Sequence, residues 1–316
     1  MFDAKAFVDI QLKKIKDQMK DGKAIIACSG GVDSVVCSVL ASKAVGDKLL
    51  AVFVDTGLMR KGEPEQVRDM LKEMKVNFKI LDEEDYFLDG LKGVTDPEKK
   101  RKVIGERFIR CFEREARAYG AKYLVQGTIA PDVIESGSDG KGLVKSHHNV
   151  GGLPKDMNLE LVEPLIDLFK EDVRQVARYL GIKVSERQPF PGPGLSVRCL
   201  GEVTKENLSV VREACYIVED EIQKAAKGGK MDLPWQYFAA LLPVRSTGVH
   251  NDERMYGKTV VVRAVLTKDA ISAKPAQIPY DILESISKRI TSSLGDKVNR
   301  VVYDVTSKPP ATIEWE

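Results

Sequence analysis

The stretch AIIACSGGVDS, Ala24–Ser34, decides the fold of the chain. Its first five residues are apolar and predict a buried parallel strand. The residues from Asp33 onward predict a helix that carries Val35, Val36, Val39 and Leu40. Two glycines between the strand and the helix let the backbone bend sharply and approach a ligand closely. Because free amides and the positive end of the helix dipole then face the same point, the turn predicts an anion site.

Asp33 identifies the kind of anion. A carboxylate repels phosphate unless a divalent cation lies between them, so the turn predicts a nucleotide phosphate bound with Mg²⁺. A tight turn with helix caps would explain Asp33 or Ser34, but not two glycines with a hydroxyl on each side. The stretch is no Walker A loop, because G-x-x-x-x-G-K-[ST] is absent. It resembles the PP-loop of the ATP pyrophosphatase superfamily, which implies cleavage of ATP between the α and β phosphates.

Strand and helix patterns alternate on both sides of this turn. Further strands are predicted at 49–55, 76–81 and 122–126, with helices at 1–20, 63–75 and 96–119 between and before them. This alternation predicts an α/β fold with a doubly wound parallel sheet. Ligands bind such sheets beyond the carboxyl ends of the strands, so we expect Ser29, Asp55 and Gly127 to converge on one crevice.

Composition narrows the class of protein. The chain has 316 residues, 43% hydrophobic and 30% charged, with a net charge of +2, which is typical of a globular protein of two domains. Nothing predicts a membrane span or a nucleic-acid partner. Five scattered cysteines and three histidines predict buried thiols in a reducing, cytoplasmic compartment, with no structural transition metal.

A proline- and glycine-rich run, QPFPGPG at 188–194, predicts the domain boundary. We therefore expect a PP-loop domain at 1–187 and a smaller α+β domain with a largely antiparallel sheet at 188–316. In the second domain, a helix is predicted at 205–227 and strands at 235–242 and 259–266. Inside the first domain, residues 128–160 are rich in glycine and predict a lid in which Lys145 is a catalytic cation for phosphate. A plain linker, with His147 and His148 as surface residues, is the alternative.

Three long motifs extend the resemblance to nearly the whole chain. They are KSHHNVGGLP at 145–154, RQPFPGPGL at 187–195 and the tail SKPPATIEWE at 307–316. Together they resemble GMP synthetase, and specifically the synthetase subunit of the two-subunit form found in archaea, because the PP-loop at residue 29 leaves no room for an amidotransferase domain before it. The resemblance implies ATP-dependent amination of XMP through an adenylyl intermediate, ammonia from a partner glutaminase subunit, and a homodimer formed by the second domain.

The resemblance also implies site residues. ATP would be bound by Ser29, Gly30, Gly31, Val32, Asp33, Ser34 and Val35, with Asp33 also catalytic and a ligand of Mg²⁺. XMP would be bound by Arg101, Asp252, Arg254, Gln277, Lys308 and Glu314. For Arg101 and for the Asp252–Arg254 pair, a solvated helix face and a surface ion pair are the alternatives. An NAD synthetase-like amidotransferase is a rival function, although it would leave the tail unexplained, and a transfer RNA modifier is a weaker one.

Overall fold

The computed structural model describes residues 2–135, 159–183, 188–250 and 252–316. The chain forms two compact units, and each is described by itself. Unit 1 consists of 1–56, 62–83 and 105–187, and unit 2 of 57–61, 84–104 and 188–316. Unit 2 therefore includes two segments, 57–61 and 84–104, that the sequence placed in the first domain.

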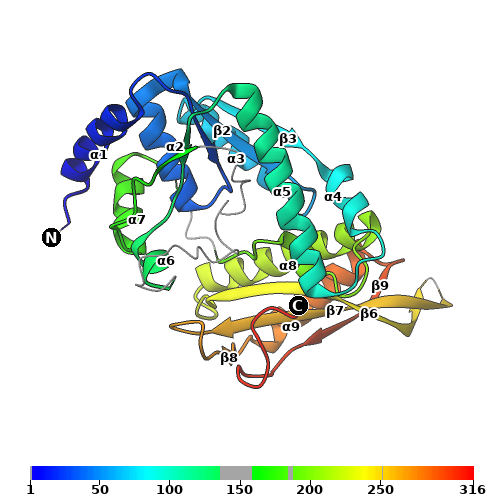
Figure 1. Ribbon diagram of the computed structural model, residues 1–316. Coiled ribbons are helices and arrows are strands. Elements are labelled where there is room, and N and C mark those ends of the chain that lie inside the picture. The colour runs from blue at the N-terminus through cyan, green and yellow to red at the C-terminus, as the bar shows by residue number, and fades with distance from the viewer. Residues whose placement is uncertain (1, 136–158, 184–187, 251) are drawn as a thin grey trace. The chain divides into compact units, whose positions relative to one another are not determined.

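Unit 1 is built on a five-stranded parallel sheet, which confirms the predicted fold class (Figure 1). The strands are β1 (Ala24–Ala27), β2 (Leu49–Asp55), β3 (Phe78–Asp82), β4 (Tyr123–Val125) and β5 (Glu160–Val162). Their order is β3-β2-β1-β4-β5, so the chain leaves β1 toward one edge and later returns to the other side of it. That reversal beside β1 is where doubly wound sheets bind their ligands.

Helices cover both faces of this sheet, as right-handed crossovers require. They are α1 (Ala4–Met19), α2 (Val32–Val45), α3 (Glu63–Glu73), α5 (Pro97–Tyr119), α6 (Ala130–Glu135) and α7 (Lys170–Tyr179), with a short 3-10 turn η1 (Gly46–Lys48). α1, α2 and α7 pack together, and α5 lies on the other side of the sheet (Figure 1). Val8, Ile15 and Met19 bury one face of α1, as their spacing predicts.

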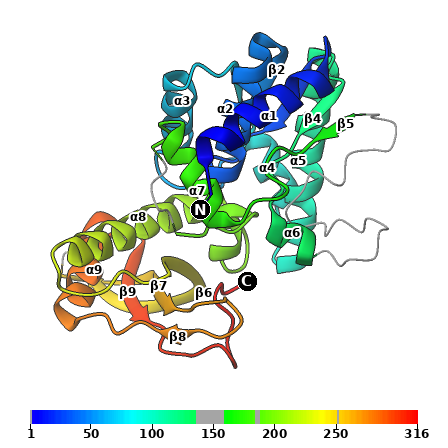
Figure 2. The same ribbon diagram turned by 90° about the vertical axis from the view of Figure 1, so that its left-hand side faces the viewer.

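Unit 2 contains a second, mixed sheet. Its elements are α4 (Glu84–Leu91), the first turns of α5, η2 (Gly194–Arg198), α8 (Lys205–Lys227), β6 (Gln236–His250), β7 (Glu253–Leu266), β8 (Lys274–Pro275), α9 (Tyr280–Ser293) and β9 (Val298–Tyr303). β6, β7 and β8 are antiparallel neighbours, whereas β9 runs parallel to β7. α8 and α9 pack against the sheet and against each other (Figure 2). A smaller α+β unit was predicted, and its sheet is antiparallel except for β9.

The predicted thiol state also agrees with the structure. All five cysteines are buried and free of disulfide bonds. Among the described helices, none is long and apolar enough to cross a bilayer.

Candidate functional site

The loop after β1 has the backbone of an anion site. Gly30 adopts a φ of 77°, which glycine tolerates, and a Cβ there would lie 2.8 Å from Cγ2 of Val67. Gly31 is the N-cap of α2 and offers no side chain to cap it. The first-turn amides of α2 therefore keep their positive ends directed out of the helix, where an anion can accept from them. The structure starts α2 at Val32, one residue earlier than the sequence predicted.

Hydroxyl groups close the loop on itself. The Ser34 hydroxyl donates to the Gly31 carbonyl at 3.0 Å and accepts from the Ser29 amide at 3.2 Å. The Ser29 hydroxyl lies 3.2 Å from that of Ser34 and accepts from the Gly31 amide at 3.4 Å. These contacts hold the loop in one shape before any ligand binds, which lowers the entropy cost of binding.

Asp33 has one satisfied and one unsatisfied oxygen. Its Oδ2 accepts from Nζ of Lys170, the first residue of α7, at 2.5 Å. Its Oδ1 is buried and has no hydrogen-bond partner among the described residues. A buried carboxylate oxygen without a donor suits a cation, because hard cations take oxygen ligands. The described residues contain no cluster of three or more metal-ligating side chains. Mg²⁺ needs none, since it binds through one or two carboxylates with phosphate and water.

Gly127, just after β4, brings a second turn to the loop. A Cβ on Gly127 would lie 3.1 Å from the carbonyl carbon of Asp33 and 3.2 Å from the Ser34 amide nitrogen. The next residue, Thr128, donates its hydroxyl to Glu163 at 2.5 Å, so β4 and the segment after β5 are tied together beside the loop. Two of the three predicted turns therefore meet, as the switch point requires.

The six residues predicted to bind XMP all belong to unit 2, but they occupy two places. Arg101 pairs with Glu98 at 2.6 Å on one turn of α5, and its neighbour Lys100 contacts the last residue of the tail, Glu316. Lys308 joins Ala273 in an isolated bridge, and its Nζ donates to the carbonyl of Ala270 at 2.7 Å.

Gln277 is exposed just after β8, near the same bridge. Asp252 and Arg254 lie instead at the turn between β6 and β7, and both are exposed. The structure thus brings Gln277, Lys308 and Glu314 toward the Val265 end of the β6–β7 hairpin and leaves Asp252 and Arg254 at its turn. Arg101 belongs with neither group, since its neighbour Lys100 binds Cys199 and Glu316 beside Leu241.

Glu314 is held by a fork of donors. Arg198, fully buried, donates Nη2 to Oε1 at 2.8 Å and Nε to Oε2 at 3.1 Å, and Gln236 Nε2 donates to Oε1 at 2.8 Å. Burial alone would disfavour the guanidinium charge, but the adjacent Glu314 carboxylate raises the pKa of Arg198. Among the described residues, Oε1 thus has two donors and Oε2 one, so the carboxylate has a fixed orientation and Oε2 can accept a further hydrogen bond.

Two further buried cations hold the tail. Lys100 donates to the carbonyls of Ser196 and Cys199 as well as to Glu316. Arg263 donates to the carbonyls of Thr306 at 2.5 Å and Thr312 at 3.0 Å. A tail of this length normally frays, and here buried charges order it.

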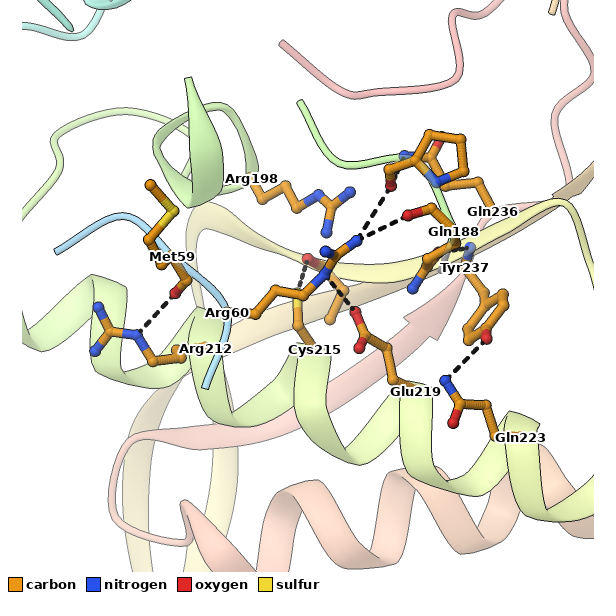
Figure 3. Close-up of polar contacts among 12 residues, drawn as sticks. Met59, Arg60, Gln188, Arg198, Arg212, Cys215, Glu219, Gln223, Gln236 and Tyr237 are labelled. Atoms are coloured by element: carbon orange, nitrogen blue, oxygen red, sulfur yellow. Dashed lines mark hydrogen bonds and ion pairs between the residues drawn. The ribbon is translucent and has the colours of Figure 1, made fainter. Parts of the chain in front are cut away.

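Arg60 is the centre of a further network in unit 2 (Figure 3). Its Nη2 donates to the carbonyl of Gln188 at 3.0 Å, its Nε lies 3.5 Å from Glu219, and its guanidinium stacks on Phe190 at 4.2 Å. The proline-rich run is therefore fixed by a residue from segment 57–61.

Lys145 lies outside the described residues, so its predicted role stays a prediction. Lys170 is the site residue that the sequence reasoning missed. A signal for it exists: a lysine at the first position of a helix opposes the helix dipole, which favours acidic residues there. Such a cation at the carboxyl end of a parallel sheet indicates an anionic ligand.

Two family models match the chain. Residues 23–127 match the phosphoadenosine phosphosulfate reductase domain, and residues 220–315 match the GMP synthase C terminal domain. The first match covers the glycine turn and β1 to β4, and the second covers β6 to β9 and most of the tail.

Full-length relatives agree with the second model. A protein of Methanopyrus kandleri, named as one subunit of GMP synthase [glutamine-hydrolyzing], is 54% identical over all of both chains. The protein of the same name from Archaeoglobus fulgidus is 54% identical over 99% of this chain and all of its own. GMP synthase [glutamine-hydrolyzing] of Clostridium botulinum, which is not named as a subunit, is 52% identical over 98% of this chain and 61% of its own longer chain. The chain belongs to the GMP synthase [glutamine-hydrolyzing] family, and the relatives that it matches from end to end are named as one subunit of that enzyme.

Proposed function

We propose that the chain is the synthetase subunit of a GMP synthase. It adenylylates the C2 oxygen of XMP with ATP, releases pyrophosphate, and lets ammonia displace AMP to give GMP. The end-to-end match to relatives named as one subunit of this enzyme carries the proposal. The chemistry fits, because a ring carbonyl oxygen is a poor leaving group and AMP is a good one.

ATP binds at the loop after β1 in this proposal. The α2 amides and the hydroxyls of Ser29 and Ser34 hold the phosphates, and Asp33 Oδ1 is a ligand of Mg²⁺. When bound, Mg²⁺ neutralises charge on the departing pyrophosphate. Lys170, whose Nζ pairs with Asp33, would bind a phosphate oxygen of the nucleotide. Lys145 is the second proposed cation for phosphate.

XMP binds to unit 2 in this proposal. Lys308 and Arg101 supply positive charge for the phosphate, and Glu314 accepts from an N–H of the purine. Support comes from the fixed orientation of the Glu314 carboxylate and from its free acceptor position on Oε2. Gln277, exposed two residues after β8, adds an amide.

Ammonia comes from a separate glutaminase subunit in this proposal, because the matching relatives are named as one subunit of a glutamine-hydrolysing enzyme. Ammonium salts at alkaline pH replace that partner in vitro. With glutamine as the only nitrogen source, we expect no activity until a glutaminase subunit is added.

An assay with XMP, Mg·ATP and ammonium chloride tests the function. We expect GMP, AMP and pyrophosphate in equal amounts, and no turnover when deamido-NAD replaces XMP. Release of ADP and phosphate, or preference for deamido-NAD, would overturn the proposal.

A further inference from the structure

The Glu314 carboxylate is held more firmly than the order of the tail requires. Other groups already anchor the tail: the side chain of Ile313 is buried, and two buried cations bind nearby parts of the segment. Arg263 binds backbone carbonyls, and Lys100 binds the side chain of Glu316. None of these contacts involves the Glu314 carboxylate, so the donors gathered on that carboxylate point to a role beyond tail order.

The donors and the carboxylate differ in their access to a ligand. Arg198 donates Nη2 and Nε to the two carboxylate oxygens at 2.8 and 3.1 Å, and Gln236 Nε2 donates at 2.8 Å. The Arg198 side chain is fully buried, whereas that of Glu314 is 20% exposed. A ligand can therefore reach the carboxylate but not the guanidinium. Arg198 can act on a ligand only through Glu314.

Both donors are themselves held in one orientation. The central carbon of the Arg198 guanidinium lies 4.2 Å from the ring centre of Phe238 and 5.1 Å from that of Phe190. Aromatic faces attract this planar cation and restrict its rotation. The amide of Gln236 donates to the carbonyl of Pro189 at 3.3 Å as well as to the carboxylate. The donors thus fix the plane in which the carboxylate lies.

Arg198 also determines what the carboxylate can bind. A guanidinium stays protonated in proteins and favours the charged form of its partner. An ionised carboxylate accepts hydrogen bonds and donates none, so the ligand atom that meets Oε2 of Glu314 must carry a hydrogen. Neutral xanthine has an N–H at both ring nitrogens beside C2, whose oxygen is adenylylated in the proposed reaction. A hydrogen bond from one of them orients the ring and polarises it toward that oxygen.

We propose that Arg198 is a positioning residue that sets the base specificity of this site. Because it holds Glu314 as an acceptor in one orientation, the site selects purine nucleotides with an N–H beside the reacting carbonyl and rejects those with a lone pair there. A lone pair that faces the carboxylate leaves both groups without a hydrogen-bond partner. The inference rests on the proposed function, since it concerns the base of the XMP held at the same site.

Two substitutions of Arg198 separate its charge from its paired hydrogen bonds. Arg198→Lys keeps the charge but loses the planar fork, and Arg198→Met loses both while it fills the space between the two rings. The readout is the Kd of purine riboside 5′-monophosphate, which has no ring N–H, divided by the Kd of XMP, both from calorimetry. We expect Arg198→Met to lower this ratio by about 10- to 100-fold, as for one hydrogen bond to a charged group, and Arg198→Lys to lower it less.

Gln236→Glu tests the orientation without a change at Arg198. At low pH the new side chain is protonated and can donate to Oε1 of Glu314 as the amide does. As the pH rises it ionises, and two adjacent carboxylates repel each other. XMP should therefore bind this variant with nearly native affinity at about pH 5 and about tenfold more weakly at about pH 8. Native protein measured at each pH corrects for the titration of XMP itself. Glutamate has the shape of glutamine, so a role in packing alone would give no such pH dependence.

Arg289→Met is the matched control. Arg289 lies on α9, where it binds Asp220 and Glu221, so its loss should leave the ratio of the two Kd values unchanged. The melting temperature and the Kd of Mg·ATP, measured for every variant, show whether the protein is folded.

The outcomes separate this inference from the proposed function. If folded Arg198 variants keep the native ratio, or if Gln236→Glu keeps the native pH dependence, Arg198 does not set the specificity and the inference is wrong. Should Arg198→Met fail to fold, Arg198→Lys and Gln236→Glu decide. If the native protein itself binds XMP no better than purine riboside 5′-monophosphate, the proposed function fails instead.

Discussion

Asp33 and Lys170 form an ion pair, which the proposed substrate would separate. Their side chains are 26% and 45% exposed, so the pair itself contributes little to stability. Mg²⁺ and a phosphate group offer each partner a stronger contact than the other side chain does, since both are multiply charged. In the proposed function, the pair keeps both side chains oriented toward the loop until the nucleotide separates them.

Replacing Lys170 by Met should lower kcat/KM for ATP by about 10- to 100-fold, because one charge-assisted contact to phosphate is lost. Lys170→Arg should recover part of the loss. Pyrophosphate release at varied ATP measures this effect. Lys183→Met is the control, because Lys183 is exposed and pairs with Glu73 elsewhere in unit 1. Equal activity of the Lys170 and Lys183 variants would remove Lys170 from the site.

Asp33→Asn should raise the Mg²⁺ concentration needed for half-maximal activity by about tenfold or more, because an amide is a weaker ligand of a hard cation than a carboxylate. A Mg²⁺ titration at saturating ATP and XMP measures the shift. The melting temperature should change little, since the lost ion pair is partly exposed. An unchanged Mg²⁺ dependence would show that Asp33 is not a metal ligand.

At this scale, the sequence predicted the residues of the loop well and their neighbours poorly. Ser29–Ser34 follow from local chemistry, because strand, glycines and helix are consecutive. Lys170 is far along the chain from Asp33, and only the parallel order of β1, β4 and β5 brings the start of α7 to the loop. No local sequence pattern predicts that Lys170 and Asp33 are neighbours.

The turn after β4 packs closely against the loop after β1, so a substitution at Gly127 tests whether this contact shapes the loop. Gly127→Ala places a methyl group 3.1 to 3.3 Å from Asp33 and Ser34 atoms, so loop and turn must separate by a few tenths of an ångström. We expect KM for ATP to rise severalfold and stability to fall by about 1 kcal/mol. Steady-state kinetics and urea unfolding measure the two effects.

Gly105→Ala is the matched control for that change. Gly105 lies inside α5 with open space around its Cα, so alanine there should stabilise the protein by about 0.5 to 1 kcal/mol through helix propensity alone. It should leave KM for ATP unchanged. If Gly127→Ala also leaves KM unchanged, the close approach has no role in shaping the loop.

Elements of unit 2 show where periodicity fails as a predictor. α8 was predicted with the same bounds as observed, since its apolar residues recur at helical spacing. β6 and β7 were predicted too short, at 235–242 and 259–266, because only those parts are buried. Their extension to the turn is stabilised by pairing between the strands and by Asn299, which donates to the Ser246 carbonyl, and not by an apolar face.

The division of the whole molecule depends on contacts between distant residues. Segment 57–61 belongs to unit 2 because Leu58 accepts from the Leu195 amide at 2.8 Å and Arg60 binds the proline-rich run. Gly194 has a φ of 63° and no room for a Cβ against Leu58. The proline-rich run is recognisable in the sequence as a boundary. Composition does not predict that segment 57–61 packs against this run.

Burial of the five thiols makes the stability of the whole protein sensitive to alkaline pH. Burial raises the pKa of each thiol, and of Cys111 and Cys199 to about 11. A raised pKa means that the folded state binds the proton more tightly than the unfolded chain. The resulting stability is complete below the unfolded pKa of 9.0 and is lost as the pH rises through the folded value.

Cys111→Ala isolates one such contribution. Between pH 8 and pH 10, the free energy of unfolding of the native protein should fall by about 1 kcal/mol more than that of the variant, since one pKa unit corresponds to about 1.4 kcal/mol. Urea unfolding at both pH values measures this difference. Comparing the two proteins cancels the contribution of lysines and tyrosines, because both proteins contain them.

The thiols should also resist alkylation at pH 8 until urea unfolds the chain, because all five are buried. Rapid alkylation of the native protein, or the same pH dependence in both proteins, would contradict the assignment of alkaline sensitivity to the buried thiols.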